Sequence, residues 1–468
     1  MPLSARANQT FEPPAQTSRA LRAALRARPA AASTLAALAV LAVAGPLAGC
    51  AAASSGSAGT ASRASAGPSA ASAGTGPTPS SPIAAVPPVP ASSCAGTGTA
   101  AEATATASPG TGSGAGAGSG QSPALAAVQF TDSGHGWVAG AGRIMATTDG
   151  GASWTRQYTG MADLDQVDFI DRQHGWAAGG GSLLRTTDGG ASWTALAEPC
   201  QGELSSVHFV SPALGYAVAS PTAAGQPPGG QSIGGQDTTA LGGSLLRTTN
   251  GGSTWSPVTS APADPQSACF ANADDGYLGT PARIWRTTDG GQHWTLALTE
   301  PGASGNPKTA DTPEIECAGA SGLWVLFLGQ GAAMEHAPYV AYNSQDGHQW
   351  HGVLEQQYTE SALRPGVKLP EGPGSYPGPF SVINSGSAAF VGYTPPIGYG
   401  VAPVMLASDN GHALAAEGNV GTINEPLAAA FLSQDQGWVI GENLKTNVFD
   451  VEATGNAGRT WTTQYTVG

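Results

Sequence analysis

The sequence predicts an all-β fold, a seven-bladed β-propeller of four-stranded antiparallel blades, over residues 124–468. Three observations predict it. A box of the form Thr-Thr-Asp-Gly-Gly-x-x-Trp recurs along this region, an aromatic element precedes every box, and each resulting unit is roughly 49 residues long with four strand signals. Such a unit is typical of a propeller blade. Because one blade cannot bury both faces of its own sheet, the units must stack around an axis. A β-sandwich is the minor alternative.

The box has four close copies and three degraded ones, and all seven keep a glycine at the fifth position. The close copies begin at Thr147, Thr186, Thr248 and Thr287, and the degraded ones at Asn343, Ala407 and Thr454. The residues expected to build these turns are Asp149, Trp154, Asp188, Trp193, Asn250, Trp255, Asp289, Trp294, Asp409, Asn456 and Trp461.

Each residue type in the box has a structural duty. In the second copy, Asp188 can accept hydrogen bonds from backbone N–H groups two residues on and from the Thr186 hydroxyl. The two glycines permit positive φ. Trp193 can pack its ring into the blade and donate its indole N–H locally. The box is therefore predicted to be a structural turn between the third and fourth strands, with no catalytic residue in it.

The aromatic element supplies the first two strands, as in "VDFIDRQHGWAAG" from Val167. The middle residue of the innermost strand reads, around the ring, Gln129, Asp168, His208, Cys269, Glu316, Val382 and Ala430. If these residues line the channel, Asp168, His208 and Glu316 could bind a small polar ligand or a metal. Polar groups satisfied around channel water are the alternative. No spacing of Cys or His predicts a metal site, and no motif predicts a cofactor.

The alignment of the repeats also predicts a disulfide. Cys269 occupies one innermost-strand position in the fourth unit, and Cys317 lies one place later in the fifth. Adjacent positions on a strand face opposite ways. The two side chains can therefore meet across the boundary between blades 4 and 5.

Residues 1–49 have the layout of a secretory signal peptide, with arginines ahead of an apolar run. Residues 47–50, Leu-Ala-Gly-Cys, resemble the lipobox of bacterial lipoproteins, whose cysteine is lipidated. We therefore expect an exported protein, anchored to the outer face of the cell membrane through Cys50. A plain cleaved signal or an uncleaved anchor is the alternative.

Residues 50–123 are predicted to be a disordered linker. They are rich in Ala, Gly, Ser, Thr and Pro and contain no aromatic residue. Such a segment cannot bury enough apolar surface to offset its chain entropy.

Charge separates the N-terminal region from the predicted propeller. Residues 1–123 carry six Arg and two Glu, whereas residues 124–468 carry 12 basic and 30 acidic residues, a formal charge near −18. A surface of that sign repels phosphate backbones. Nucleic acid is therefore excluded as an expected partner.

The boxes resemble the Asp-box, or bacterial neuraminidase repeat. The longer unit, V-x-F…G-W-A-x-G…L-x-T-T-D-G-G-x-x-W, is most similar to the photosystem II assembly and stability factor family of seven-bladed propellers, and the resemblance covers residues 124–468. It implies boxes on the side away from the ligand and a non-catalytic binding scaffold for a protein or envelope component; we expect a monomer. That family presents an arginine-rich patch, whereas this propeller is acidic, so its specific partner is not expected to transfer.

The runner-up is a glycan-active enzyme or lectin of the Asp-box group. A sialidase needs an arginine triad, but Arg185, Arg247 and Arg286 occupy one equivalent repeat position, which favours a scaffold role. The Arg-Ile-Pro signature is absent, since "RIMATT" lacks the proline. Xyloglucan-active enzymes resemble tandem propellers, and this chain has length for one. The sequence leaves open that two of its acidic residues face each other as a catalytic pair.

Long insertions are expected on the face opposite the boxes, where strands two and three and successive blades are joined. Long loops gathered on one face are a functional hint. The candidate ligand contacts in or beside them are Tyr358, Arg364, Lys368, Tyr376, Tyr393 and Tyr399. The alternative is that these side chains only decorate the loops.

Overall fold

The computed structural model describes residues 124–197, 199, 203–220, 243–300, 311–319, 322–329, 337–356, 369–394 and 400–468. In these residues the chain forms 28 strands, grouped into seven sheets of four. The seven-bladed propeller predicted from the repeats is therefore confirmed. The expected signal peptide, the linker and Cys50 lie outside the described residues.

Each blade is one continuous stretch of chain, and its strands pair in sequence order. Blade 1 holds β1 (Ala127–Phe130), β2 (Gly136–Gly140), β3 (Arg143–Thr147) and β4 (Thr155–Thr159). Blade 2 holds β5 (Gln166–Phe169), β6 (Gly175–Gly179), β7 (Ser182–Thr186) and β8 (Thr194–Leu196). Blade 3 holds β9 (Glu203–Phe209), β10 (Gly215–Ser220), β11 (Ser244–Thr248) and β12 (Ser256–Pro257). Blade 4 holds β13 (Ser267–Phe270), β14 (Asp275–Thr280), β15 (Arg283–Thr288) and β16 (Thr295–Thr299).

The later blades have longer strands. Blade 5 holds β17 (Thr312–Ala318), β18 (Gly322–Leu328), β19 (Tyr339–Ser344) and β20 (His351–Gln356). Blade 6 holds β21 (Tyr376–Asn384), β22 (Ser387–Tyr393), β23 (Pro403–Ser408) and β24 (Ala413–Asn419). Blade 7 holds β25 (Glu425–Phe431), β26 (Gly437–Asn443), β27 (Val448–Thr454) and β28 (Thr462–Val467). All neighbouring strands are antiparallel.

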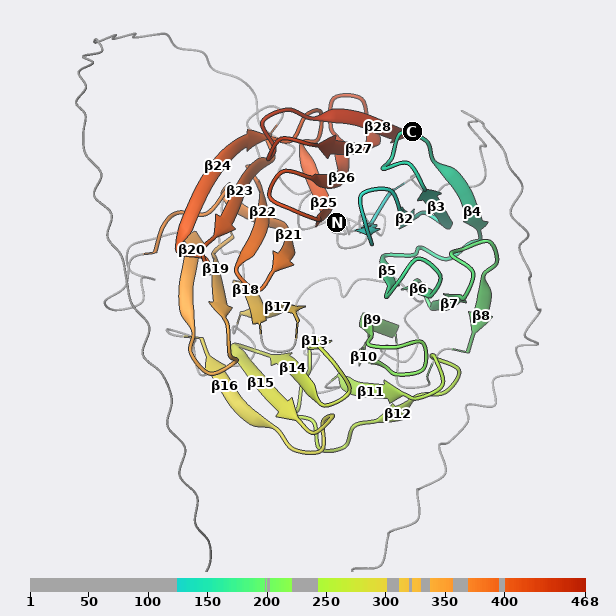
Figure 1. The fold of residues 1–468 in the computed structure, drawn as a ribbon, viewed down its shortest axis with the longest axis vertical. Helices are drawn as coiled ribbons and strands as arrows, with labels where there is room; N and C mark the ends of the chain where they lie inside the picture. Colours follow the sequence, from blue (N-terminus) through green and yellow to red (C-terminus); the bar gives the residue numbers. More distant parts are fainter. Residues whose placement is uncertain are drawn as a thin grey trace, which may run out of the picture. The chain divides into compact units, whose positions relative to one another are not determined.

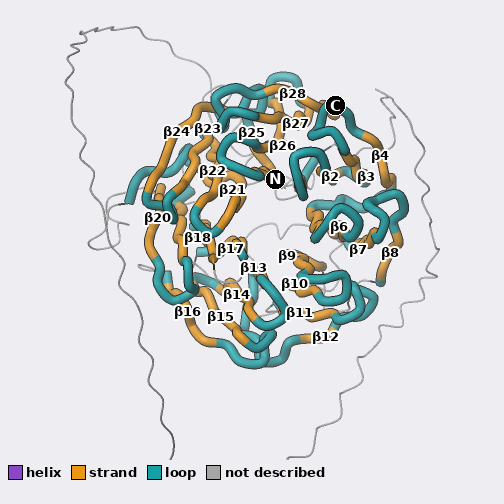
Figure 2. The backbone as a smooth tube through the Cα atoms, in the orientation of Figure 1, coloured by secondary structure: helices purple, strands orange, loops and turns teal. Residues whose placement is uncertain are grey.

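The first strand of each blade lies innermost and the fourth outermost (Figure 1). Consecutive innermost strands contact one another from β1 through β5, β9, β13, β17 and β21 to β25, and β25 contacts β1, which closes the ring. No helix occurs in the described residues (Figure 2), so none of them forms an apolar helix able to cross a membrane. The architecture follows from strands alone.

Burial follows the position of a strand within its blade. The second strand is covered on both faces by neighbouring blades, so all five residues of β6 are buried. The outermost β4 alternates between exposed and half-buried residues. Within the described part, seven clusters of buried apolar residues form the core, one at each boundary between blades. The core of this protein is thus a set of seams between blades.

An aromatic stack holds four of these seams. The Phe at the end of one innermost strand lies flat on the aromatic ring of the preceding blade's second strand. The pairs are Trp438–Phe130, Trp137–Phe169, Trp176–Phe209 and Tyr216–Phe270, with ring centroids 3.4 to 3.6 Å apart. The glycine paired with each Phe is required, because a Cβ on Gly175 would overlap the Phe169 ring.

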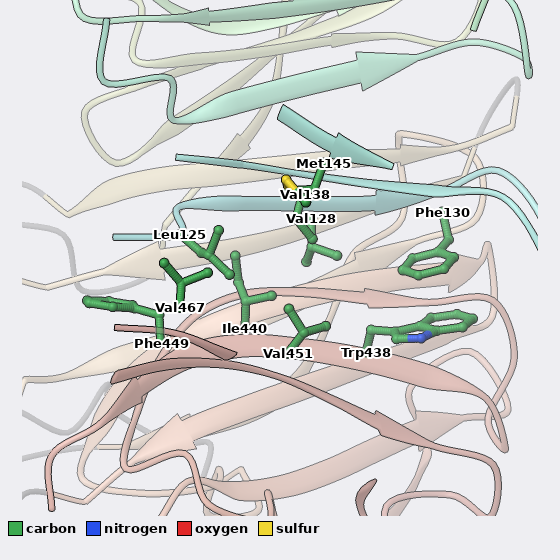
Figure 3. Packing of buried hydrophobic residues seen from close by; sticks show 10 residues of the cluster. All are labelled: Leu125, Val128, Phe130, Val138, Met145, Trp438, Ile440, Phe449, Val451 and Val467. Carbon is green, nitrogen blue, oxygen red and sulfur yellow. The ribbon is translucent and has the colours of Figure 1, made fainter. Parts of the chain in front are cut away.

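The ring closes by side-chain packing between blades 7 and 1, with no strand exchanged between them. Figure 3 shows this seam, where the Trp438 ring lies beneath the Phe130 ring at a centroid distance of 3.5 Å. Trp438 Nε1 and Gln464 Nε2 both donate to the carbonyl of Gly150 in the first box, at 3.3 and 3.0 Å. The first and last blades are therefore joined by both apolar and polar contacts.

Candidate functional site

The box is a closed hydrogen-bonded turn between the third and fourth strands. In blade 2 the Thr186 hydroxyl donates to Asp188 Oδ1 at 2.8 Å and accepts from the Gly190 N–H at 2.8 Å. The same Asp188 oxygen accepts from the Ser192 N–H at 2.9 Å. The prediction that Asp188 accepts from a backbone N–H two residues later is thus wrong. The donor lies four residues on, because the Thr hydroxyl, not the carboxylate, holds the glycine N–H.

The box tryptophans pack into the seams but differ in their polar contacts. Trp193 meets Phe169 edge-on, with centroids 5.9 Å apart, and its buried Nε1 has no partner among the described residues. The expected local donation is therefore wrong for this residue. Trp294 and Trp461 do donate locally, to the carbonyls of Gly291 and Gly458 at 3.1 and 2.9 Å.

Two degraded boxes depart further from the pattern. In blade 5 the turn is one residue shorter than expected, because Ser344 takes the place of the Thr: its hydroxyl accepts from Gly347 N and contacts Asp346 Oδ1. In blade 6, Ala407 occupies the Thr position, and no donor among the described residues reaches the Asp409 carboxylate. Asp409 therefore accepts from the described residues none of the hydrogen bonds expected of a box aspartate.

The repeated arginines bridge neighbouring blades on the box side. Arg185 lies over the Trp176 ring at 5.7 Å and donates to the Pro212 carbonyl in the next blade at 3.2 Å. Arg286 lies over Tyr277 in the same way and donates to the Asp346 carbonyl at 3.0 Å. These contacts spread the arginines around the ring, one per blade, so they cannot converge on one substrate carboxylate.

The innermost strands are joined by side-chain contacts from each blade to the next, from blade 1 to blade 7. Gln129 accepts from the Phe169 N–H at 2.6 Å, and Asp168 accepts from the Phe209 N–H at 2.6 Å. His208 Nε2 contacts the Phe270 carbonyl at 2.8 Å. In each contact, the side chain at the middle position of one innermost strand meets the residue that follows the middle position in the next blade. We call these contacts the inter-blade latches.

The latches continue through the later blades with different chemistry. Cys269 and Cys317 form a disulfide, with Cα atoms 5.8 Å apart, at the position where a hydrogen bond stands elsewhere. Glu316 Oε2 accepts from the Val382 N–H at 2.9 Å. Ser381 Oγ accepts from the Phe431 N–H at 2.9 Å. The blade 6 member of the ring is therefore Ser381, one residue before the Val382 expected from the alignment.

The latches change the interpretation of the three channel candidates. Asp168, His208 and Glu316 were expected either to bind a ligand or to be satisfied around water; instead each holds the backbone of the next blade. No group of three or more His, Cys, Asp or Glu residues able to hold a metal occurs in the described part of the chain. All three residues therefore serve as inter-blade latches.

Glu316 has two features besides its latch contact, a raised pKa and a position at a cavity. Burial raises the pKa of its carboxyl to about 7, the Val382 N–H acts against this shift, and the charge of Glu314 adds to it. Burial also raises the pKa of Asp168, whereas His208 and the Phe209 N–H lower it. Only one Glu316 oxygen is used in the latch, and Glu316 also lines a cavity.

This cavity, of about 480 Å³, lies between the innermost strands of blades 3 to 7. We call it the channel cavity. Its polar wall includes Glu314, Glu316 and Gln266, and its apolar wall includes Phe380 and Leu427. The lining residues belong to the early parts of these strands, which follow the connections between blades. The channel cavity therefore lies toward the face opposite the boxes.

Acidic side chains also gather where the first connections between blades reach this face. Burial raises the pKa of the Asp165 carboxyl to about 6; Gln166 opposes the shift, and the charges of Glu203 and Asp163 add to it. Asp165 comes directly before β5, and Glu203 is the first residue of β9. Three acidic side chains therefore lie close enough to repel one another at this face.

The expected loop contacts are placed only in part. Tyr358, Arg364, Lys368 and Tyr399 lie outside the described residues. Tyr376 begins β21, and Tyr393 ends β22 and is 5% exposed, with the two rings 6.0 Å apart. Tyr393 is thus packed against its own blade and cannot serve as the exposed contact expected of it.

Sequence reasoning missed Glu314 and Gln266. A usable signal was present for Glu314, because a residue two places before Glu316 on the same strand must face the same side. Nothing in the repeat pattern singles out Gln266 or the Pro377–Phe380 stretch. These residues are brought together only by the closure of the ring.

Comparison with known proteins finds a family match and several similar solved structures. Residues 120–199 match the family described as photosynthesis system II assembly factor YCF48. A solved structure described as YCF48 bound to D1 peptide is 16% identical, with a TM-score of 0.42, over 69% of this chain and 91% of that one. YCF48 from Cyanidioschyzon merolae is 15% identical, with a TM-score of 0.33, over 73% and 85%.

Glycosidases are also among the similar solved structures. The GH74 enzyme from Niastella koreensis is 13% identical, with a TM-score of 0.49, over 70% of this chain and 52% of that one, so this chain spans about half the length of that enzyme. No curated protein matches the sequence. The chain is therefore a propeller whose first repeats match the family described as photosynthesis system II assembly factor YCF48.

Proposed function

We propose that this protein is a non-catalytic binding scaffold that holds a protein or envelope component against the face opposite the boxes. One observation carries the proposal. The boxes and the latch residues hold the ring together, and the channel cavity lies toward the face opposite the boxes. The family matched by residues 120–199 is described as an assembly factor, which agrees with a binding role.

Two of the three exposed large apolar side chains in the described residues support this choice of face; the third, Leu296, follows the box of blade 4. Met161 is 92% exposed and lies in the connection between blades 1 and 2. Val401 is 47% exposed and lies between the second and third strands of blade 6. Both segments belong to the face that carries the channel cavity. Exposed apolar residues beside polar ones are common at protein-binding surfaces.

Photo-crosslinking in intact cells tests the proposal. A photoreactive amino acid at Met161 should capture a discrete protein or envelope component, whereas the same group at Asp435, in the loop between β25 and β26 on the box face, should not. Equal capture from both positions, or capture from Asp435 alone, contradicts the choice of face.

Membrane attachment belongs to the same proposal. We propose that Cys50 carries a lipid and that the propeller is displayed outside the cell membrane on the segment that follows. Replacing Cys50→Ala should move the protein from the membrane fraction to the soluble fraction, measured by blotting. Unchanged membrane retention contradicts the lipid anchor but leaves the binding face untouched.

A glycan-active enzyme is the second candidate, and one observation favours it. Glu314 and Glu316 lie two residues apart on one strand and both line the channel cavity. Alternate residues on a strand face the same side, and glycosidases use a pair of carboxylates in one cleft as general acid and base. Turnover of fluorogenic glycosides that is lost in Glu316→Gln would replace the scaffold proposal by this one.

A further inference from the structure

Blade 5 is held at its box face by one histidine on each side. His348 follows the turn of the shortened box, and its Nε2 accepts a hydrogen bond from Arg286 Nη1 of blade 4. His351 begins β20, and its ring lies flat on the His412 ring of blade 6, with centroids 4.3 Å apart and an interplanar angle of 11°. The two histidines therefore join blade 5 to opposite neighbours.

The contact with Arg286 requires a neutral imidazole. A guanidinium has only donors, so His348 Nε2 must offer its lone pair, and a protonated ring has none to offer. The carboxylate of Asp346 attracts a charged His348, but it accepts from the backbone N–H groups of His348 and Gln349 and not from the ring. Protonation of His348 thus replaces a hydrogen bond between blades 4 and 5 by the contact of two cations.

The group beneath Arg286 does not relieve this contact. Arg286 lies over the Tyr277 ring, and burial raises the pKa of the Tyr277 hydroxyl, so this group stays neutral at acid pH. Arg286 also donates to the Asp346 carbonyl at 3.0 Å. The arginine is therefore held in place opposite His348, and its charge stays there when the histidine is protonated.

The stack on His412 requires a neutral His351 ring. His351 Nε2 is buried without a partner among the described residues, and Gly411 closes over it, since a Cβ on Gly411 would lie 3.0 Å from this nitrogen. A proton added there would have no acceptor. Burial accordingly lowers the pKa of His351, and the charge of His412 adds to the shift.

The pH dependence of this stack has a definite sign. The carboxylates on the elements around the pair are Asp409 in the blade 6 turn, Glu355 on β20 and Glu417 on β24, and none of them contributes to the shift. As pH falls, the unfolded chain takes up a proton before the folded one does. The stability that the neutral stack provides is therefore present above pH ~6.5, the ordinary pKa of histidine, and is lost below it.

Seams elsewhere in the ring are joined at the box face by groups that do not titrate in this range. The contacts are Gln464 Nε2 to the Gly150 carbonyl, Gln157 Nε2 to the Gly189 carbonyl and Arg185 Nη2 to the Pro212 carbonyl. They join blades 7 and 1, 1 and 2, and 2 and 3. Acid should therefore leave these seams closed.

We infer that blade 5 is an acid-sensitive element of the ring: protonation of His348 and His351 releases its box-face contacts with blades 4 and 6 and loosens its outer strands. The inference goes beyond the scaffold function and does not require it. Blade 5 also contributes Glu316 to the wall of the channel cavity, so a loosened blade 5 alters the cavity that the proposed binding face carries.

Hydrogen exchange of the full-length protein at pH 7.5 and pH 5.0 tests the inference, measured by mass spectrometry with labelling times scaled for the intrinsic exchange rate of the amides. Protection of peptides from residues 339–356 in blade 5 should fall at least tenfold at the lower pH. Protection of peptides from residues 175–196 in blade 2 should change less than twofold. Equal loss in both blades, or no loss in blade 5, would overturn the inference.

Matched variants identify the groups responsible. In His348→Gln with His351→Phe, the glutamine can still accept from Arg286 and the phenylalanine can still stack on His412, but neither titrates. This pair should reduce the acid loss in blade 5 to less than twofold. His135→Gln with His174→Gln removes two histidines from the box face, and each of these contacts an aspartate of its own turn. That pair should leave the loss in blade 5 unchanged, and the reverse pattern contradicts the inference.

The native protein provides a second measurement if the first pair does not fold. The imidazole signals of His348 and His351, followed by nuclear magnetic resonance, should titrate over the same pH range in which blade 5 loses protection. Titration of both rings with unchanged protection would overturn the inference. Neither result changes the expected crosslink from Met161, so the scaffold function stands or falls separately.

Discussion

The seams between blades 7, 1, 2, 3 and 4 differ from those between blades 4, 5, 6 and 7. In the first group one contact is repeated: a Phe stacked on the aromatic ring of the preceding blade. In the second group Cys317 and Val382 replace the Phe in blades 5 and 6, and a disulfide and a single latch stand in place of the stack. Blade 7 keeps its Phe431, which meets the box Trp461 edge-on, without a stacked ring from blade 6 among the described residues. Both the channel cavity and a second hollow beside Cys317 and Val382 are lined by blades 5 and 6. The regular seams build the ring, and its irregular part leaves room for a ligand.

The largest expected effect tests the stack itself. Phe209→Ala should lower the free energy of unfolding by about 3 to 5 kcal/mol, because it empties a buried site between Trp176 and Trp255. Val382→Ala, at the equivalent position of the irregular part, should cost only about 1 kcal/mol, because Val382 is smaller and half-buried. Urea unfolding measures both. Equal losses would remove the distinction between the two groups of seams.

The next test concerns the disulfide, which takes the place of the aromatic stack between blades 4 and 5. Cys269→Ser with Cys317→Ser should cost about 2 to 4 kcal/mol, because the bond closes a loop with a sequence separation of 48. Addition of a reductant to the native protein should lower the unfolding midpoint by the same amount and leave the double variant unchanged. A midpoint insensitive to both would mean that blades 4 and 5 are held by apolar packing alone.

A smaller effect concerns the box. Thr186→Val removes the hydroxyl that joins Gly190 N to Asp188, and should cost about 1 to 3 kcal/mol because the buried N–H is left unpaired. Its neighbour Thr187 is exposed, so Thr187→Val should stay within about 0.5 kcal/mol. Thermal unfolding of the two variants, side by side, measures the difference. A Thr187→Val loss as large as that of Thr186→Val would contradict the role assigned to the hydroxyl.

The pH dependence of stability should have opposite signs for Glu316, in the irregular part of the ring, and for the box aspartate of blade 1. The pKa of Glu316 is raised to about 7, so the folded state binds more protons than the unfolded state between pH 4.5 and 7. Its contribution is greatest below that range and is lost as pH rises through 7. Glu316→Gln should therefore gain stability relative to the native protein between pH 5 and 8, by on the order of 2 kcal/mol.

The box aspartate of blade 1 should behave in the opposite way. Its Ser153 hydrogen bonds lower the pKa of Asp149 to about 2, so its contribution is present above pH 4 and is lost as pH falls toward 2. Asp149→Asn should thus remove the loss of stability that the native protein shows as pH falls below 4. Unfolding curves at pH 3, 5 and 8 check both variants, and a Glu316→Gln profile parallel to the native one would contradict the raised pKa.

Much of the fold could be predicted because its information is local and repeated. The Thr, Asp and Gly residues of the box specify a turn within nine residues, and the Phe and Gly pair specifies where two strands stack. The errors lie where the repeat degrades. The ring residue of blade 6 is Ser381 and the box of blade 5 is one residue shorter, since a worn repeat no longer fixes the strand register.

The sequence by itself determined the number of blades, the order of their strands and the pairing of Cys269 with Cys317, because each follows from comparing one repeat with the next. Tertiary structure alone decided what the channel residues do. Asp168, His208 and Glu316 look alike as polar residues at one repeat position, yet each reaches a backbone group 41 to 66 residues away in the next blade. The grouping of Gln266, Glu314 and Phe380 around one cavity exists only when the ring is closed, because these residues come from three different blades.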